Sequence, residues 1–251
     1  MKLFAAIHWI RTISLYGIRI SVKLFMVRFH SSNFLPIKGP RLLDEKEFLM
    51  RLKINPEDLL MFKREFAEIY SKSLIICPHQ SGIKEKSGFI LFTLVRKYLP
   101  KKIFESGFQS GRSTYIILQA LNLNGQGSLS SLDIIKRTIP ESIRGFKNFN
   151  LYVIKMRIQK FYGDLILRES PDFWFLDSDN RFYAQLTELR AARKSSKIIL
   201  VNNAHVSNAS DKFWIESGWL QFSFSEGERT LTLFLDPNLF NYLDSGQNTS
   251  P

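Results

Sequence analysis

The hydrophobic pattern of the chain changes near residue 87, and from there short apolar runs alternate with longer amphipathic ones. Short runs rich in aliphatic and aromatic side chains are typical of buried strands, and longer runs bounded by Gly or Pro are typical of helices. The predicted strands are 102–105, 128–133, 151–156, 173–177 and 197–201. The predicted helices in this part are 89–99, 114–121 and 181–194. Strands that alternate with helices indicate an α/β domain with a mostly parallel sheet.

Two more apolar runs, 219–224 and 230–235, flank the segment Ser-Glu-Gly-Glu-Arg, which predicts a C-terminal antiparallel hairpin. Polar residues stand at the predicted ends of four earlier strands: Glu105, Asp133, Asp177 and Asn202. Ligands of mostly parallel sheets bind beyond the carboxyl ends of the strands. We therefore expect the functional site at this edge of the sheet.

The first part of the chain has a different character, and we expect three regions: 1–41, 42–81 and 82–251. Residues 1–41 contain seven Lys and Arg and no Asp or Glu. Their apolar and basic positions separate on a helical wheel, which is typical of a helix on an anionic membrane surface. Packing on the protein's own core, or a strand at 18–24, would give similar patterns. Arg11, Arg19 and Lys23 argue against a helix that spans the membrane.

A linker with two Pro and a Gly follows at 31–41, and a helical extension follows the linker. The pattern predicts helix over 44–73. Within this range, Asn55 suits a helix cap and Pro56 suits a first turn.

Composition and charge narrow the classes of partner. The chain has 251 residues, a formal net charge of +12, four His and one Cys. A single Cys excludes an internal disulfide framework and favours a reducing, cytoplasmic location. In that location, residues 1–30 would contact the inner face of the membrane. The positive charge favours anionic partners. No basic and aromatic recognition module stands out, so we do not expect nucleic acid as the main partner.

The segment KIFESGFQSGRST, residues 102–114, carries the clearest chemistry. It lacks the Gly-Lys-Ser/Thr of a phosphate-binding P-loop and the G-x-G-x-x-G of a dinucleotide site. Glu105, two residues before the first glycine, would repel a pyrophosphate and would suit a cationic ligand with an amino group and a sulfonium. Asp133 lies about 20 residues beyond the loop, where an acid can accept hydrogen bonds from a ribose. Together these features favour S-adenosylmethionine.

These residues resemble motif I of class I S-adenosylmethionine-dependent methyltransferases, E-x-G-x-x-x-G-x-S-T. Three later segments, SLSSLDI, FWFLDSDNRFYAQLTELRAA and ILVNNAHVSNASDKF, are similar to the following motifs of the sugar and macrolide O-methyltransferase and cephalosporin-hydroxylase-like subgroup. The resemblance implies a Rossmann-like fold. It also implies the cofactor-binding residues Glu105, Gly107, Gly111, Ser113, Asp133 and Asp177.

The match departs from the family where that family often holds a divalent metal. Asn180 replaces a histidine, and Asn202-Asn203 replace a pair of acids. Neutral amides supply no negative charge to a hard cation, so a metal requirement is doubtful and we assign no metal ligands. The third-strand motif also departs, because it reads Lys155-Met156-Arg157 where a small loop is usual.

The reaction that the resemblance implies is methyl transfer to a hydroxyl of a sugar, a glycolipid or another small molecule. It needs a base for the hydroxyl proton. His205 is the first candidate, followed by Asp177 and Asp179. Two alternatives stay open. One is a catalytically weakened binding or scaffold protein with the same fold, and the other is a nucleic-acid methyltransferase. The sequence does not indicate an oligomeric state.

Overall fold

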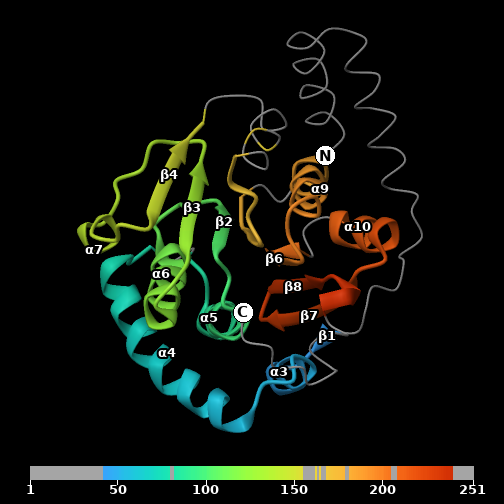
Figure 1. Cartoon of the computed structure of the whole chain (residues 1–251), viewed down its shortest axis with the longest axis horizontal. Coiled ribbons are helices and arrows are strands. Elements are labelled where there is room, and N and C mark those ends of the chain that lie inside the picture. Colours follow the sequence, from blue (N-terminus) through green and yellow to red (C-terminus); the bar gives the residue numbers. More distant parts are fainter. Residues whose placement is uncertain are drawn as a thin grey trace, which may run out of the picture. The chain divides into compact units, whose positions relative to one another are not determined.

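The computed structural model describes residues 42–79, 82–154, 162, 164, 168–178, 181–204 and 208–239. Several sequence predictions lie outside these residues: the basic segment 1–41, the third-strand residues 155–157, the candidate bases Asp179 and His205, and Asn180. The described strands form one eight-stranded sheet in the order β1-β7-β8-β6-β5-β2-β3-β4 (Figure 1). Their bounds are β1 Leu42–Leu43, β2 Lys102–Ser106, β3 Ser128–Asp133, β4 Phe149–Val153, β5 Phe173–Leu176, β6 Ile198–Asn202, β7 Leu220–Glu226 and β8 Arg229–Leu235.

The sheet is mostly parallel, as predicted. Strand β8 pairs antiparallel with both β6 and β7, and every other described pair is parallel. The predicted C-terminal hairpin is therefore confirmed, and β8 lies inside the sheet between two strands that run the other way. A short strand, β1, was not predicted, because two residues are too few to show a period. The strand predicted at 151–156 begins earlier, at Phe149, and is described as far as Val153.

The strands in the middle of the sheet are buried on both faces, so their sequences are continuous apolar runs. In β5, Phe173 and Phe175 belong to one hydrophobic cluster, whereas Trp174 and Leu176 belong to the other. The same alternation holds along β6. Because successive side chains of a strand point to opposite faces, each run supplies both cores at once.

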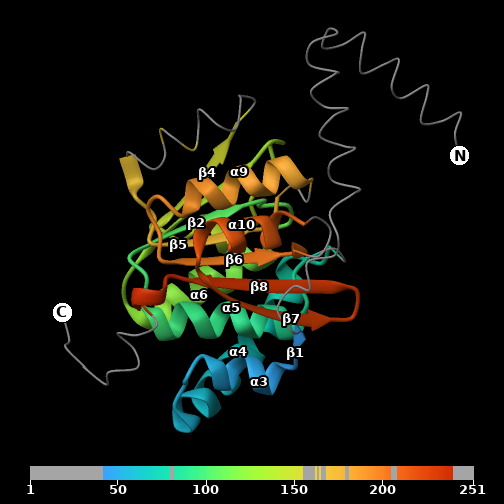
Figure 2. The ribbon, with the colours of Figure 1, turned by 90° about the vertical axis from the view of Figure 1, so that its right-hand side faces the viewer.

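Helices cover both faces of the sheet (Figure 2). Their bounds are α3 Glu45–Arg51, α4 Pro56–Ile76, α5 Glu85–Tyr98, α6 Arg112–Asn124, α7 Glu141–Arg144, α9 Phe182–Ala192 and α10 Ala209–Ser217. Helices α9 and α10 lie on one face, and α5 and α6 lie on the other with α4 outside them. No helix in the described part of the chain is both long and apolar enough to cross a bilayer.

The helix predicted over 44–73 is two helices. Helix α3 ends at Arg51, and α4 begins at Pro56 after a turn in which Lys53 has a φ of +52°. The predicted cap is confirmed, because the Asn55 side chain accepts a hydrogen bond from the Glu57 backbone N–H at 2.9 Å. Apolar residues of both helices share a core with α5 and α6. Where the domains divide stays a prediction.

The turn between β7 and β8 is fastened to the start of α5. The Glu226 carboxylate accepts hydrogen bonds from the backbone N–H groups of Lys86 and Ser87, at 3.2 and 3.0 Å, and from the Ser87 hydroxyl at 2.8 Å. The cap residue of α5, Lys84, makes no capping bond with its own side chain. Glu226 therefore caps this helix from a distant part of the sequence, with its negative charge at the positive end of the helix.

We predict that Glu226→Ala lowers the free energy of unfolding by about 1–2 kcal/mol, the usual cost of a lost helix cap. Urea unfolding followed by circular dichroism measures this change. Glu228→Ala is the matched control, because Glu228 is an exposed acid of the same turn. Equal stability of the two variants would contradict the capping role.

Candidate functional site

The carboxyl ends of β2 and β5 mark the point where the order of the strands reverses. The chain runs from β2 outward through β3 to β4 and then returns to place β5 on the other side of β2. Connections that leave two neighbouring parallel strands in opposite directions open a crevice at their carboxyl ends, which is the common ligand site of such sheets. The loop that contains Gly107 and Gly111 begins at this point.

The two glycines of this loop are required by the protein's own packing. Gly107 and Gly111 have φ values of +95° and +85°, which favour glycine. A Cβ atom on Gly107 would lie 2.4 Å from the backbone oxygen of Asp177, and one on Gly111 would lie 2.7 Å from the side chain of Ile143. At both glycines the close approach is to neighbouring segments of the protein itself. Direct contact of these glycines with a cofactor stays a prediction.

Glu105 lies at the centre of this region and is fully buried. Its carboxylate accepts hydrogen bonds from the hydroxyls of Ser113 and Thr114 at 2.5 Å and from the hydroxyl of Ser131 at 2.6 Å. Burial raises the pKa of this carboxyl, and the three hydroxyls act against that rise. Glu105 thus fastens the start of α6 and strand β3 to strand β2. The described structure gives it and Ser113 a positioning role, and their contact with a cofactor stays a prediction.

Asp133, at the end of β3, is nearly buried and also has partners within the protein. Its carboxylate accepts hydrogen bonds from the backbone N–H groups of Gln109 and Ile135, at 3.0 and 2.9 Å, and from Arg137 Nε at 3.2 Å. The bond to Gln109 ties the glycine loop to β3. Of these three donors, Arg137 is a side chain and the other two are backbone N–H groups, so its bond is the easiest for a ligand hydroxyl to replace.

Asp177, directly after β5, is only partly buried and lies beside Asn202 at the end of β6. The Asn202 side chain donates a hydrogen bond from Nδ2 to Asp177 Oδ1 at 3.0 Å. The pKa of Asp177 is raised to about 7, mainly by burial and also by the nearby Glu105, and the hydrogen bond from Asn202 opposes this rise. A carboxyl with a pKa near neutrality can both accept and release a proton under physiological conditions.

Four buried polar side-chain atoms in this region have no hydrogen-bond partner in the described structure: Ser106 Oγ, Ser110 Oγ, Arg112 Nε and Asn202 Oδ1. Unpaired buried polar atoms are rare and costly in folded proteins, and water or a ligand commonly satisfies them. All four belong to the ends of β2 and β6, the glycine loop and the first residue of α6. Their concentration at one edge of the sheet indicates a ligand site there.

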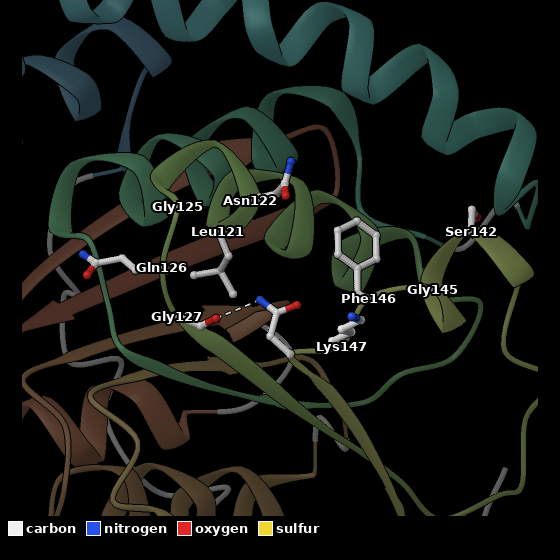
Figure 3. Close-up of a pocket in the computed structure, with 10 residues that line it drawn as sticks. Leu121, Asn122, Gly125, Gln126, Gly127, Ser142, Gly145, Phe146 and Lys147 are labelled. Atoms are coloured by element: carbon white, nitrogen blue, oxygen red, sulfur yellow. Dashed lines mark hydrogen bonds between the residues drawn. The ribbon is translucent and has the colours of Figure 1, made fainter.

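A separate pocket of about 640 Å³ lies at the opposite edge of the sheet (Figure 3). It is lined by the end of α6, the turn before β3 and the segment before β4, including Gly127, Lys147 and Asn148. Asn148 donates a hydrogen bond to the Gly127 backbone oxygen at 2.7 Å, which joins two of these segments. None of the predicted site residues lines this pocket, so it is distinct from the site at the carboxyl ends.

Comparison with known proteins tests the fold. No protein-family model matches the sequence, and no curated protein matches it. Solved structures do match the fold. A putative O-methyltransferase from Klebsiella pneumoniae is 18% identical, with a TM-score of 0.50, and the match covers 74% of this chain and 98% of that one. The cofactor-bound Rv0187 protein from MTB is 16% identical, with a TM-score of 0.51 and coverage of 72% and 97%.

A third match is the O-methyltransferase TomG from Streptomyces achromogenes, which is involved in tomaymycin synthesis and was crystallised in complex with SAM. It is 17% identical, with a TM-score of 0.50, and the match covers 68% of this chain and 88% of that one. The chain has the class I methyltransferase fold. In this methyltransferase fold, Glu105, Asp177 and the glycine loop lie at the carboxyl ends of β2 and β5.

Several residues of the site were not predicted from the sequence, among them Ser131 and Arg112. Ser131 contributes a hydroxyl to Glu105, and Arg112 contributes a buried cation. Ser131 could have been found from the parallel register, because it stands directly opposite Glu105 when β2 and β3 are aligned. Arg112 gives no such signal, because an arginine after a glycine reads as an exposed residue.

We predict that Glu105→Gln lowers the free energy of unfolding by about 1–3 kcal/mol. The amide keeps the shape of the side chain but replaces one acceptor oxygen with an NH₂ group, so at least one of the three bonds that the hydroxyls donate is lost. Thermal and urea unfolding measure the loss, and Glu228→Gln supplies the same chemical change at an exposed site. A Glu105→Gln protein as stable as this control would show that the three hydroxyl bonds do not hold the loop.

We also predict that the stability difference between the wild type and Asp177→Asn depends on pH. The pKa of Asp177 is raised from 3.8 to about 7 in the folded protein. Between these values the folded state keeps a proton that the unfolded state has released, so the stability of the wild type falls as the pH rises through this window. Asp177→Asn avoids this loss.

As the pH rises from 4 to 7, the free energy of unfolding of the variant should therefore increase by about 1–3 kcal/mol relative to that of the wild type. The change is kept to this size because the Asp177 side chain is only partly buried. Above pH 7 the difference should stay constant. Urea unfolding at several pH values tests this expectation. A difference that does not change with pH would contradict the raised pKa.

Proposed function

We propose that the protein binds S-adenosylmethionine at the carboxyl ends of β2, β3 and β5 and transfers its methyl group to a hydroxyl group. The observation that carries this proposal is the set of unpaired buried polar atoms, which gather around the glycine loop of a methyltransferase fold. Structures of this fold include TomG, an O-methyltransferase in complex with SAM. The motif resemblance at Glu105, Gly107, Gly111 and Ser113 supports the same cofactor.

The residues present fit this cofactor. The loop backbone and the unpaired hydroxyls of Ser106 and Ser110 offer donors and acceptors at the strand ends. Asp133 would hold the ribose, whose hydroxyls can replace the Arg137 side chain as donors to the carboxylate. When bound, the cofactor supplies an activated methyl group on a sulfonium. The protein's part is to align the acceptor oxygen with that group, since alignment supplies much of the rate in such reactions.

Asp177 is the described residue best suited to take the proton from the acceptor hydroxyl. Asn202 holds its Oδ1, and its Oδ2 makes no hydrogen bond within the described residues. Asp177 Oδ2 would accept the proton that the acceptor hydroxyl loses when it takes the methyl group from the sulfonium. With a pKa of about 7, Asp177 is partly ionised at neutral pH and is basic enough to accept a proton. His205 and Asp179 stay proposals as further bases.

A divalent metal fits this edge poorly. Among the described residues, the donors at the ends of β5 and β6 are one carboxylate, Asp177, and two neutral amides, Asn202 and Asn203. Asn202 turns its amide nitrogen toward Asp177, which places a donor where a metal would need an oxygen. The proton transfer described above needs no metal, and we derive no step through one.

The chemical class of the acceptor is also a proposal. The sequence resemblance supports a hydroxyl of a sugar, a glycolipid or another small molecule. Residues 1–30 are the part of the chain suited to an anionic membrane surface, which would suit a lipid-linked acceptor. If residues 1–30 bind such a membrane surface, a protein without residues 1–41 should no longer bind anionic vesicles.

We predict that S-adenosylmethionine and S-adenosylhomocysteine bind the purified protein in calorimetric titration, and that magnesium does not change their affinity. Asp133→Asn should weaken both by about tenfold or more, because a charged acceptor becomes an amide. Lys147→Ala, in the pocket at the opposite edge, is the control that should leave binding unchanged.

Absence of binding in a folded sample would overturn the proposed function and favour a weakened protein that keeps only the fold. Binding that is lost in Lys147→Ala and kept in Asp133→Asn would move the site to the opposite edge. A requirement for magnesium would show that Asn202 and Asn203 still serve a metal.

A further inference from the structure

Glu188 is a buried acid in the middle of α9. The residue is 3% exposed and lies among the buried residues of this helix, beside Leu189 and Ala192. A glutamate is almost never fully buried unless hydrogen bonds or an opposite charge compensate for the loss of water. The hydrogen-bond partners of Glu188 therefore indicate its role.

Two hydroxyl groups from different segments donate hydrogen bonds to the same carboxylate oxygen of Glu188, Oε1. One is the hydroxyl of Tyr162, and the other is that of Ser178, at 2.5 Å. The Tyr162 ring packs edge-on against Phe104 of β2 and Trp174 of β5, with centroid distances of 6.0 and 5.8 Å. Tyr162 thus fixes the carboxylate of Glu188 against the sheet, and this fixed carboxylate in turn holds Ser178.

Ser178 directly follows Asp177, the described residue best suited to act as the base. The described structure holds this part of the chain from three directions. The backbone N–H of Asp177 donates to the Ser106 backbone oxygen at 2.9 Å, and its side chain accepts from Asn202 at 3.0 Å. The third contact comes from α9, where the buried Glu188 anchors the exposed Ser178. The loop after β5 is therefore tied to α9 as well as to β2 and β6.

Glu188 also acts on Asp177 through its charge, but more weakly. The pKa of Asp177 is raised mainly by burial, and the negative charges of Glu105 and Glu188 add to the rise. The hydrogen bond from Asn202 and the positive charge of Arg229 oppose it. Among these influences the charge of Glu188 is the smallest. The contact through Ser178, and not the charge, is therefore the main link between α9 and Asp177.

We propose that Glu188 is a positioning residue for Asp177. Through the Ser178 hydroxyl it keeps the loop after β5 in the place where Asp177 can take the proton of the acceptor hydroxyl. The task given to Asp177 rests on the proposed function. The contact does not, because it belongs to the folded chain before any ligand binds. If the contact is removed, Asp177 should gain access to water, and its pKa should fall toward the ordinary value of a carboxyl group.

The test measures the pKa of Asp177 by nuclear magnetic resonance of isotope-labelled aspartate carboxyl groups. The signal is assigned by its absence in Asp177→Asn. The titrated proteins are the wild type, Ser178→Ala, Ser178→Thr, Glu188→Gln and Ser142→Ala. Ser178→Thr keeps the hydroxyl, and Glu188→Gln keeps the accepting Oε1 but removes the charge. Ser142 is an exposed serine at the opposite edge of the sheet, so its replacement is the matched control.

Ser178→Ala should lower the pKa of Asp177 by about one pH unit, which is a tenfold change in its affinity for a proton. Ser178→Thr and Ser142→Ala should leave the pKa at the wild-type value. Glu188→Gln should lower it less than Ser178→Ala does, because both hydroxyls keep their acceptor. If Glu188→Gln does not fold, the two variants of the exposed Ser178 still decide the matter.

An unchanged pKa in Ser178→Ala overturns the proposal, because Glu188 would then only fasten α9 to Tyr162. A larger fall in Glu188→Gln than in Ser178→Ala also overturns it, because the charge and not the contact would act on Asp177. Calorimetric titration of the wild type with S-adenosylhomocysteine tests the proposed function separately. If this ligand does not bind, the proposed function fails, and the pKa measurements still show whether Glu188 positions Asp177.

Discussion

The buried carboxylate of Glu105 is the constraint on which the site depends. A carboxyl group that is sealed from water is tolerated only when hydrogen-bond partners satisfy it, and here the partners come from the start of α6 and from strand β3. To bring those hydroxyls together, β2 and β3 must be parallel with Glu105 opposite Ser131, and α6 must begin close to the end of β2. The left-handed turn at Gly111 allows the helix to begin there.

The same edge of the sheet is braced by polar side chains that act between distant segments. Glu226 caps α5 from the β7–β8 turn, Arg229 donates to the Gly82 backbone oxygen at 3.0 Å, and Arg112 holds the segment that precedes α5. Apolar packing fixes the two cores of the sheet, but these directional bonds fix the loops at its carboxyl ends. Because these polar side chains already have partners within the protein, the described buried polar atoms that lack one indicate where a ligand would bind.

The sequence predicted the central strands closely, because buried parallel strands are short apolar runs with recognisable ends. It failed where tertiary contacts decide the structure. The break at Lys53 divides a helix that periodicity alone would continue, and β1 is too short to have a pattern. In the site, the sequence located Glu105 and Asp133 but not their partners. Hydroxyls such as Ser131 become ligands of a carboxylate only when strand register places them there.

The charges of the crevice suit a ligand that carries both signs. Two acidic side chains, Glu105 and Asp177, lie at the ends of β2 and β5, and the pKa of Asp177 is raised mainly by burial and also by the nearby Glu105. Positive charge lies at the start of α6, on Arg112 and the helix terminus. A purely anionic ligand would be repelled by the first group, and a purely cationic one by the second. An amino acid that carries a sulfonium satisfies both, and this is the part of S-adenosylmethionine that distinguishes it from nucleotides.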